Sequence, residues 1–128
     1  MKRILLALCA VSILPTTLLS ESDWFPAVVV MIEEEYANID TDLTAPQLAE
    51  KGIVHGKRFN ARFKDHRMNV FLGKDYSDVE RDEWVALIEQ AGNLQIAISF
   101  GHAATKINCA KGDTVYIQEL GNPEDNKD

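Results

Sequence analysis

The chain has 128 residues, of which 46% are hydrophobic, and a formal net charge of −7. A chain of this length has room for one small domain with one modest core. The excess of acidic side chains argues against binding to nucleic acid and to anionic membrane surfaces, since both depend on lysine and arginine.

The N-terminal segment, residues 1–22, has the layout of a secretory signal peptide. Two basic side chains precede an apolar run over residues 4–14, which Pro15 ends. That run is short for a membrane span, and Ser20 and Ser22 suit the small positions before a cleavage site. We expect cleavage near these serines and a periplasmic or secreted protein that is free of the membrane. An uncleaved membrane anchor is the alternative.

Cleavage would remove Lys2, Arg3 and Cys9. For a cut after Ser20 the formal charge would change from −7 to −9, because two positive side chains leave, and Cys109 would be the one remaining cysteine. A single cysteine cannot form an intrachain disulfide. We expect Cys109 to be a small packing residue rather than a reactive thiol.

The mature part of the chain opens with a continuous apolar run over residues 27–32. Such a run predicts a strand that is buried on both faces. The three glutamates at 33–35 follow, and we interpret them as a solvated acidic edge. Metal binding is less favoured, because neighbouring residues of a strand point to opposite faces. Thr44 is then placed to cap a short helix over residues 45–51.

Two alternating segments, residues 58–63 and 68–72, predict a hairpin whose turn is formed by residues 64–66. His66 should therefore lie exposed at the tip. The three histidines, His55, His66 and His102, have no spacing typical of metal ligands, so we predict no metal site.

The last part of the domain predicts three more strands. Residues 84–88 and 94–98 flank the turn-forming cluster at 91–93, and a small-residue loop, residues 99–104, leads through a further turn to a closing strand that includes residues 114–117. We expect a mainly β fold, a small β-barrel or barrel-like sandwich of about seven strands with one short helix, over residues 23–120. Residues 121–128 should form a flexible tail.

Three segments carry a resemblance to a known family. They are IEEEYANIDTDL at residues 32–43, DYSDV at 75–79, and LIEQAGNLQIAISFGHAA at 87–104, the last followed by GDTV at 112–115. In this order and spacing they resemble the C-terminal domain of the S-adenosyl-L-methionine hydroxide adenosyltransferases, which are related to fluorinating and chlorinating enzymes. The resemblance covers about residues 27–118.

This resemblance implies a β-barrel that supplies the adenine-side wall of an adenosylmethionine pocket, across a subunit boundary of a trimer. The matching positions on the adenine side are Asn38, Tyr76, Ser99, Phe100, Gly101, His102 and Ala103. A tyrosine ring can stack on a purine, an asparagine can donate and accept hydrogen bonds, and a small-residue loop can expose backbone groups to the base.

The resemblance also implies what this chain lacks. At the family position that contacts the methionine end of the ligand, this chain has Gln90 instead of serine. The family's catalytic N-terminal domain is replaced here by the expected signal peptide, and the remaining residues contain no motif typical of a catalytic site. We therefore assign no catalytic residue, metal or cofactor, although adenosylmethionine or adenosine could bind as ligand.

Three hypotheses about function follow from these residues. The favoured one is an exported, non-catalytic module that binds a nucleoside-like small molecule or a partner subunit. The second is one half of a split hydrolase, which a separate N-terminal half would complete to convert adenosylmethionine and water to adenosine and methionine. The third is a ligand-free remnant, which would have Tyr76 in its core and no cleft beside Gly101.

Overall fold

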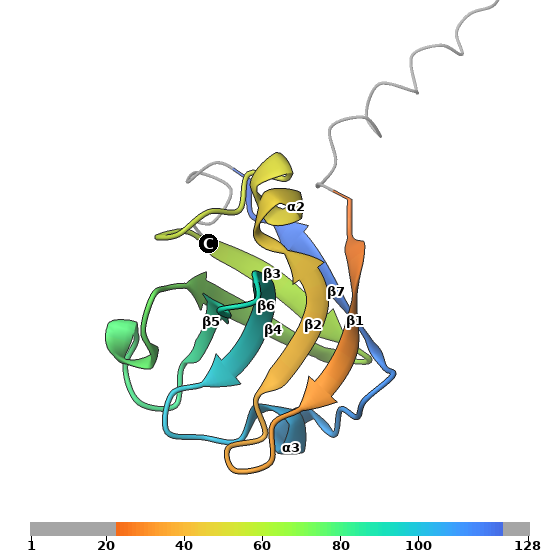
Figure 1. The fold of residues 1–128 in the computed structure, drawn as a ribbon, viewed down its shortest axis with the longest axis vertical. Coiled ribbons are helices and arrows are strands. Elements are labelled where there is room, and N and C mark those ends of the chain that lie inside the picture. The colour runs from red at the N-terminus through yellow and green to blue at the C-terminus, as the bar shows by residue number, and fades with distance from the viewer. Residues whose placement is uncertain (1–22, 122–128) are drawn as a thin grey trace, which may run out of the picture.

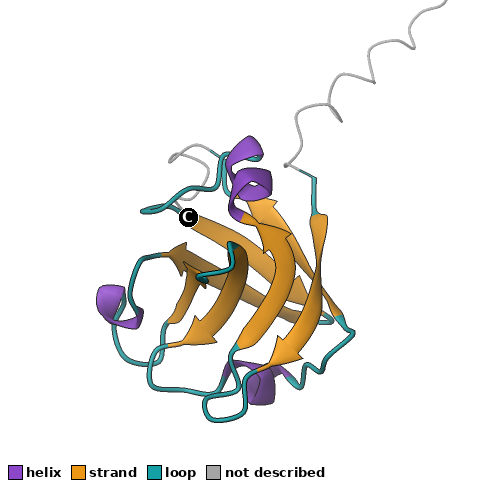
Figure 2. Ribbon diagram, in the orientation of Figure 1, coloured by secondary structure: helices purple, strands orange, loops and turns teal. Residues whose placement is uncertain are grey.

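Residues 23–121 of the computed structural model form a closed β-barrel of seven strands, in the order β1-β2-β6-β5-β4-β3-β7 (Figures 1 and 2). The strands are β1 (Phe25–Ile32), β2 (Ile39–Thr44), β3 (Arg58–Phe63), β4 (His66–Leu72), β5 (Trp84–Ile88), β6 (Asn93–Ile98) and β7 (Thr114–Glu119). The predicted mainly β barrel is confirmed. The predicted signal peptide and residues 122–128 of the predicted tail lie outside the described residues.

Two short helices and one helical turn complete the fold: α2 (Ala45–Glu50), α3 (Ala103–Ile107) and the 3-10 turn η2 (Tyr76–Asp78). Figure 1 shows α2 and α3 at opposite ends of the barrel. Leu48 of α2 and Ile107 of α3 are buried at these ends. The sequence predicted one short helix, so α3 is an addition. No helix among residues 23–121 has the length and apolar character needed to cross a membrane.

The helix α2 begins where the sequence placed it. Thr44 is its N-cap, with its hydroxyl 3.4 Å from the backbone nitrogen of Gln47, and the Gln47 side chain accepts from the Thr44 backbone at 2.9 Å. This reciprocal pair satisfies two backbone donors that the first turn of a helix leaves free. The helix ends at Glu50, one residue before the predicted end.

Strand β1 corrects the prediction of a strand buried on both faces. Ala27 and Val29 point into the barrel and are almost fully buried, but Val28, Val30 and Met31 are 38%, 43% and 49% exposed. The strand belongs to a single barrel wall, so only alternate side chains reach the core. Its outer face is apolar and uncovered in the described part of the chain.

The acidic run lies in the turn between β1 and β2 and not on a strand. Glu34 and Glu35 are exposed, as expected of a solvated edge. The Glu33 carboxylate accepts a hydrogen bond from the Tyr36 backbone nitrogen at 3.1 Å, which closes the turn locally.

The predicted hairpin is β3–β4, with an unbroken register from the pair Arg58 and Phe71 to the pair Phe63 and His66. The predicted three-residue turn was wrong, because His66 is the first residue of β4 and only Lys64 and Asp65 connect the strands. Lys64 has a φ of 55°, and a positive φ suits the tight turns between antiparallel strands. His66 is exposed, as predicted.

Strands β4 and β5 pair in parallel, unlike every other pair in the barrel. A parallel pair needs a crossover connection, and residues 73–83 supply it with η2 in the middle. Two side chains hold this connection in place. Asp75 caps η2 at the Ser77 backbone nitrogen, and Asp78 accepts from the Lys74 backbone nitrogen at 2.7 Å. The connection therefore presents Tyr76 at a fixed position.

Candidate functional site

An open cleft of about 350 Å³ lies where three connections meet at one end of the barrel. It is lined by Tyr36, Asn38, Asp75, Tyr76, Ser77, Ile98, Ser99, Phe100 and Gly101. The three connections are the β1–β2 turn, the segment around η2 and the loop between β6 and α3. A volume of this size is in the range of small-molecule sites.

The wall formed by residues 98–101 is a tight turn with a specific steric requirement. The Gly101 backbone nitrogen donates to the Ile98 carbonyl at 3.0 Å, which closes the turn. A Cβ added at Gly101 would lie 2.6 Å from Cγ2 of Ile98, so only glycine fits without a shift. The sequence predicted close backbone approach at this glycine, and Ile98 is the neighbour that requires it.

Phe100 occupies the position of this turn that glycine or asparagine usually takes. Its φ is 59°, in the left-handed region that is unfavourable for a large side chain. The ring is 74% exposed at the edge of the cleft, and the Arg81 guanidinium lies over it at 4.4 Å from the centroid. Because the ring of Phe100 is exposed to solvent, burial of this side chain in the core does not compensate for the strained backbone. Such strain is typical of functional sites.

A hydrogen-bonded network connects two residues of the cleft lining, Asn38 and Tyr76, to the buried side chains behind them. The Tyr76 hydroxyl donates to the Gln95 side-chain oxygen at 2.6 Å, and Asn38 Nδ2 lies 3.3 Å from both of these oxygens. Gln95 in turn donates to the Asp40 carboxylate at 2.8 Å. Asn38, Gln95 and Asp40 are buried, so the network fixes the Tyr76 ring by its hydroxyl while the ring itself stays 40% exposed.

The electrostatic surroundings of the cleft are negative. Burial raises the pKa of Tyr76, and the nearby carboxylates of Glu89, Glu33, Asp40 and Asp75 raise it further. Burial also raises the pKa of Glu89, with Asp40 and Glu33 adding to the effect. Asp75 differs, because hydrogen bonds from Ser77 lower the pKa of its carboxyl and keep it ionised at the rim. The Tyr76 side of the cleft therefore suits neutral or cationic groups of a ligand better than anionic ones, whereas Arg81 supplies a positive charge beside Phe100.

Five of the predicted ligand-binding residues meet in this cleft: Asn38, Tyr76, Ser99, Phe100 and Gly101. The other predicted residues lie elsewhere. His102 is exposed and borders an adjacent hollow of about 320 Å³, which shares Ile98 and Gly101 with the cleft, and the side chain of Ala103 is fully buried in the core.

Gln90 is exposed in the turn between β5 and β6, outside the lining of the cleft. Tyr76 is not part of the core, and a cleft does lie beside Gly101. These last two features are opposite to those expected of a ligand-free remnant.

The sequence reasoning missed Tyr36, which lines the cleft and is 52% exposed. Its position two residues before Asn38 could have indicated it, because both belong to one short connection. It also missed Gln95, whose partners Tyr76 and Asp40 are 19 and 55 residues away along the chain. No local pattern identifies such a contact.

The sequence matches the SAM hydroxide adenosyltransferase C-terminal domain family over residues 27–116. The chain belongs to this family. The match runs from within β1 to within β7 and includes all three connections that form the cleft. The comparison with curated proteins gave no match.

Two solved structures have a similar fold. An uncharacterized conserved protein from Thermotoga maritima is 19% identical with a TM-score of 0.71, covering 78% of this chain and 38% of that one. A conserved hypothetical protein from Thermus thermophilus is 20% identical with a TM-score of 0.51, covering 72% of this chain and 34% of that one. This chain therefore spans little more than a third of the length of the structures that it resembles.

Proposed function

We propose that this member of the family is a binding module whose cleft takes an adenosyl or nucleoside ligand. The observation that carries the proposal is the convergence of Asn38, Tyr76, Ser99, Phe100 and Gly101 on one cleft. These residues come from three distant parts of the chain, and an adenine-side role for each of them is what the family resemblance implies. Packing of a barrel alone gives no reason for them to surround a single hollow.

The chemistry of the lining supports a purine ring. Tyr36, Tyr76 and Phe100 are all exposed aromatic side chains, and they provide surfaces on which a planar base can stack. The Ser99 hydroxyl is buried, with no hydrogen-bond partner among residues 23–121, and it lines the cleft. A buried hydroxyl without a partner is costly, so a polar atom of the ligand would compensate for it.

The carboxylates near Tyr76 favour some charged groups of a ligand over others. The carboxylates around Tyr76 would repel a 5′-phosphate and attract the sulfonium of adenosylmethionine. We therefore expect adenosine and adenosylmethionine to bind, with a clear preference over adenosine monophosphate.

Isothermal titration calorimetry of the purified protein tests this proposal. Adenosine and adenosylmethionine should release heat with one site per chain, and Asn38→Ala should weaken both by about tenfold, the loss expected when a buried amide contact is removed. Lys111→Ala, an exposed change outside the lining, is the control. Absence of heat at millimolar ligand would refute nucleoside binding.

A second candidate function is a split hydrolase. It is favoured by the open cleft and by the small share of the solved structures that this chain covers. A partner would then complete the site, and water would replace methionine at the ribose carbon. The C5′–sulfur bond would break, and adenosine, methionine and a proton would form. Adenosine release that requires a second polypeptide would establish this function, and release by the chain alone would contradict the non-catalytic proposal.

The location of the protein is part of the same proposal. Residues 1–22 are proposed to direct export and to be removed, so that the module acts in the periplasm or outside the cell. Mass spectrometry of the protein recovered from each cell fraction would test this. A chain that retains Met1 in the cytoplasm would contradict it.

A further inference from the structure

A second surface of the described chain carries exposed apolar side chains and lies away from the cleft. Of the eight large hydrophobic side chains that are most exposed, Tyr36, Tyr76 and Phe100 line the cleft, while Val28, Val30, Met31 and Tyr116 lie on or beside β1. Exposed apolar side chains that gather in this way mark interaction sites more often than single ones do. We refer to the outer face of β1 with its two flanking ends as the β1 stripe.

The β1 stripe has three parts along its length. Its basic end consists of Trp24, Pro26, Arg62, Arg67 and Tyr116, its apolar middle consists of Val28, Val30 and Met31, and its acidic end consists of Glu34 and Glu35. The strand β1 itself, residues 25–32, extends over about 25 Å at roughly 3.3 Å per residue, and the acidic end follows it in the turn.

The basic end is built from one row of side chains across four strands. Pro26 pairs with Tyr116, Tyr116 pairs with Arg62, and Arg62 pairs with Arg67. The Arg62 guanidinium lies over Trp24 at 4.4 Å and over Tyr116 at 5.5 Å, and Arg67 lies over Trp24 at 5.4 Å. Tryptophan, tyrosine and arginine are the residues that dominate the binding energy of protein interfaces.

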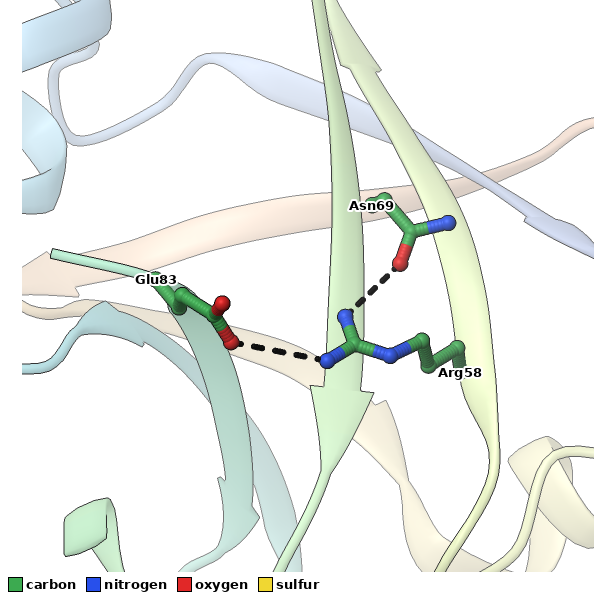
Figure 3. Close-up of polar contacts among 3 residues, drawn as sticks. All are labelled: Arg58, Asn69 and Glu83. Carbon is green, nitrogen blue, oxygen red and sulfur yellow. Dashed lines mark hydrogen bonds and ion pairs between the residues drawn. The ribbon is translucent and has the colours of Figure 1, made fainter. Parts of the chain in front are cut away.

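Arg62 and Arg67 lack a counter-charge. Like charges directly opposite on paired strands are unfavourable, yet neither arginine has a carboxylate within ion-pair distance among residues 23–121. Arg58 on the same hairpin differs, since its guanidinium lies 3.6 Å from the Glu83 carboxylate and donates to Asn69 at 2.8 Å (Figure 3). In an acidic protein, two uncompensated arginines on one aromatic cluster favour a carboxylate from another molecule.

The apolar middle and the acidic end of the β1 stripe carry groups that complement the basic end. The apolar run of β1 is typical of a strand covered on both faces, but this chain covers only the inner one. Glu34 and Glu35 extend from the turn at the far end of β1 without hydrogen bonds to the described part of the chain. The charges along the stripe thus run from positive through apolar to negative.

We propose that the β1 stripe is a self-association surface on which a second copy of this chain docks antiparallel. A two-fold axis through the middle of β1 would place Arg62 and Arg67 of one copy beside Glu34 and Glu35 of the other, twice, with the valines packed between. The complementary charges are those of the chain itself, which favours a second copy over a different partner. Because the barrel is closed, the contact is made by side chains and not by strand addition.

Analytical ultracentrifugation of the purified protein tests the central contact. The wild type should sediment as a dimer at about 100 µM, a concentration that saturates interfaces of micromolar affinity, and should dissociate with added salt. Val30→Asp should sediment as a monomer. Val54→Asp is the matched control, since Val54 is 45% exposed but lies between α2 and β3, and it should remain a dimer.

Charge reversal tests the pairing of the two ends. Arg62→Glu with Arg67→Glu should abolish the dimer, as should Glu34→Arg with Glu35→Arg, and all four changes together should restore it. Circular dichroism of each variant establishes that the barrel is folded. A monomeric wild type, a dimer that survives Val30→Asp, a trimer, or a fourfold variant that stays monomeric would each overturn the proposal.

Discussion

The cleft and the β1 stripe both present aromatic and apolar side chains to solvent, but they hold them in different ways. In the cleft, Phe100 sits on a strained turn and Tyr76 is fixed by a buried network through Gln95. On the stripe, Val28 and Val30 are exposed strand residues, and the one side-chain contact of their backbone in the described chain is the hydrogen bond from the Val28 nitrogen to the Asp42 carboxylate at 3.0 Å. A concave site with fixed polar groups suits a small molecule, and a flat apolar face with charged ends suits a protein surface.

The two regions also lie apart around the barrel. Strand β6, which leads into the cleft loop, is three positions from both β3 and β7, which carry the basic end of the stripe. The acidic end of the stripe is closer, because Glu34 and Glu35 share the β1–β2 turn with Tyr36 of the cleft. A change in the apolar middle or the basic end should therefore leave the cleft intact. The following predictions use this separation, from the largest expected effect to the smallest.

Replacement of Gly101 by alanine should have the largest effect on the cleft. The added Cβ would meet Ile98 at 2.6 Å, so the turn must move, at a cost of about 1–3 kcal/mol in stability. Adenosine affinity should fall by more than tenfold, measured by calorimetry, with no change in sedimentation. Gly112→Ala, at a glycine with open space at its Cβ position but a φ of 94° that strains alanine, should lose stability and leave adenosine affinity unchanged. Equal losses of affinity for both variants would show that the cleft turn has no special role.

Replacement of Tyr76 by phenylalanine should have an intermediate effect. It keeps the ring but removes the hydroxyl that donates to Gln95 at 2.6 Å, which should cost about 1 kcal/mol of unfolding free energy. Affinity should fall less than in Tyr76→Ala, because the stacking surface remains. Urea denaturation and calorimetry on both variants measure the two effects. An unaltered affinity in Tyr76→Ala would remove Tyr76 from the site.

Replacement of Phe100 by asparagine should separate binding from stability. Asparagine tolerates the left-handed region, so relief of about 1 kcal/mol of strain should offset the lost contact with Arg81. The unfolding free energy should thus change by less than about 0.5 kcal/mol while adenosine affinity falls. Thermal unfolding and calorimetry together test this. A large loss of stability would mean that Phe100 serves packing instead.

The smallest effect concerns Cys109, which belongs to neither region. Burial raises the pKa of its thiol to about 11, and Asp113 adds to the rise. At pH 8 alkylation should be about 100-fold slower than in the unfolded chain, because the thiolate fraction is lower. The pKa of the thiol is near 9 in the unfolded chain and about 11 in the folded one, so the protonated thiol favours the folded state. This contribution to the free energy of unfolding is complete below pH 9 and is lost as the pH rises towards 11. Equally slow alkylation of Cys109 in a cleft or stripe variant would show that the variant is folded. Rapid alkylation of Cys109 in the wild type would contradict the burial of this side chain.

Much of the fold could be predicted from the sequence because its signals are local. Alternation over residues 58–63 defined β3, and Thr44 with Gln47 defined the start of α2. The helix α3 was missed because five residues, two of them alanines in a small-residue loop, give no amphipathic period. The outer face of β1 was predicted to be buried, and this was wrong, because an apolar run indicates only that both faces of the strand are hydrophobic. It does not report whether the same chain covers them.

The cleft could be predicted only in part. The family resemblance singled out Asn38, Tyr76 and the loop around Gly101, which three connections bring together. The network through Gln95 and Asp40 depends on the register of β2 against β6, which no local pattern specifies. Ala103 lies in the first turn of α3 with its side chain in the core, a position that the small-residue loop in the sequence did not indicate.

The most direct test of the two-region account is an amide NMR titration of the nitrogen-labelled protein with adenosine at constant protein concentration. Signals of Asn38, Tyr76 and Phe100 should shift with saturation, while those of Val28 and Val30 should stay in place. Dilution without ligand should give the opposite pattern, with shifts at Val28 and Val30 and none at Tyr76 and Phe100. Adenosine shifts that are absent, or that spread equally over β1 and the cleft, would contradict the assignment of a nucleoside site to this end of the barrel.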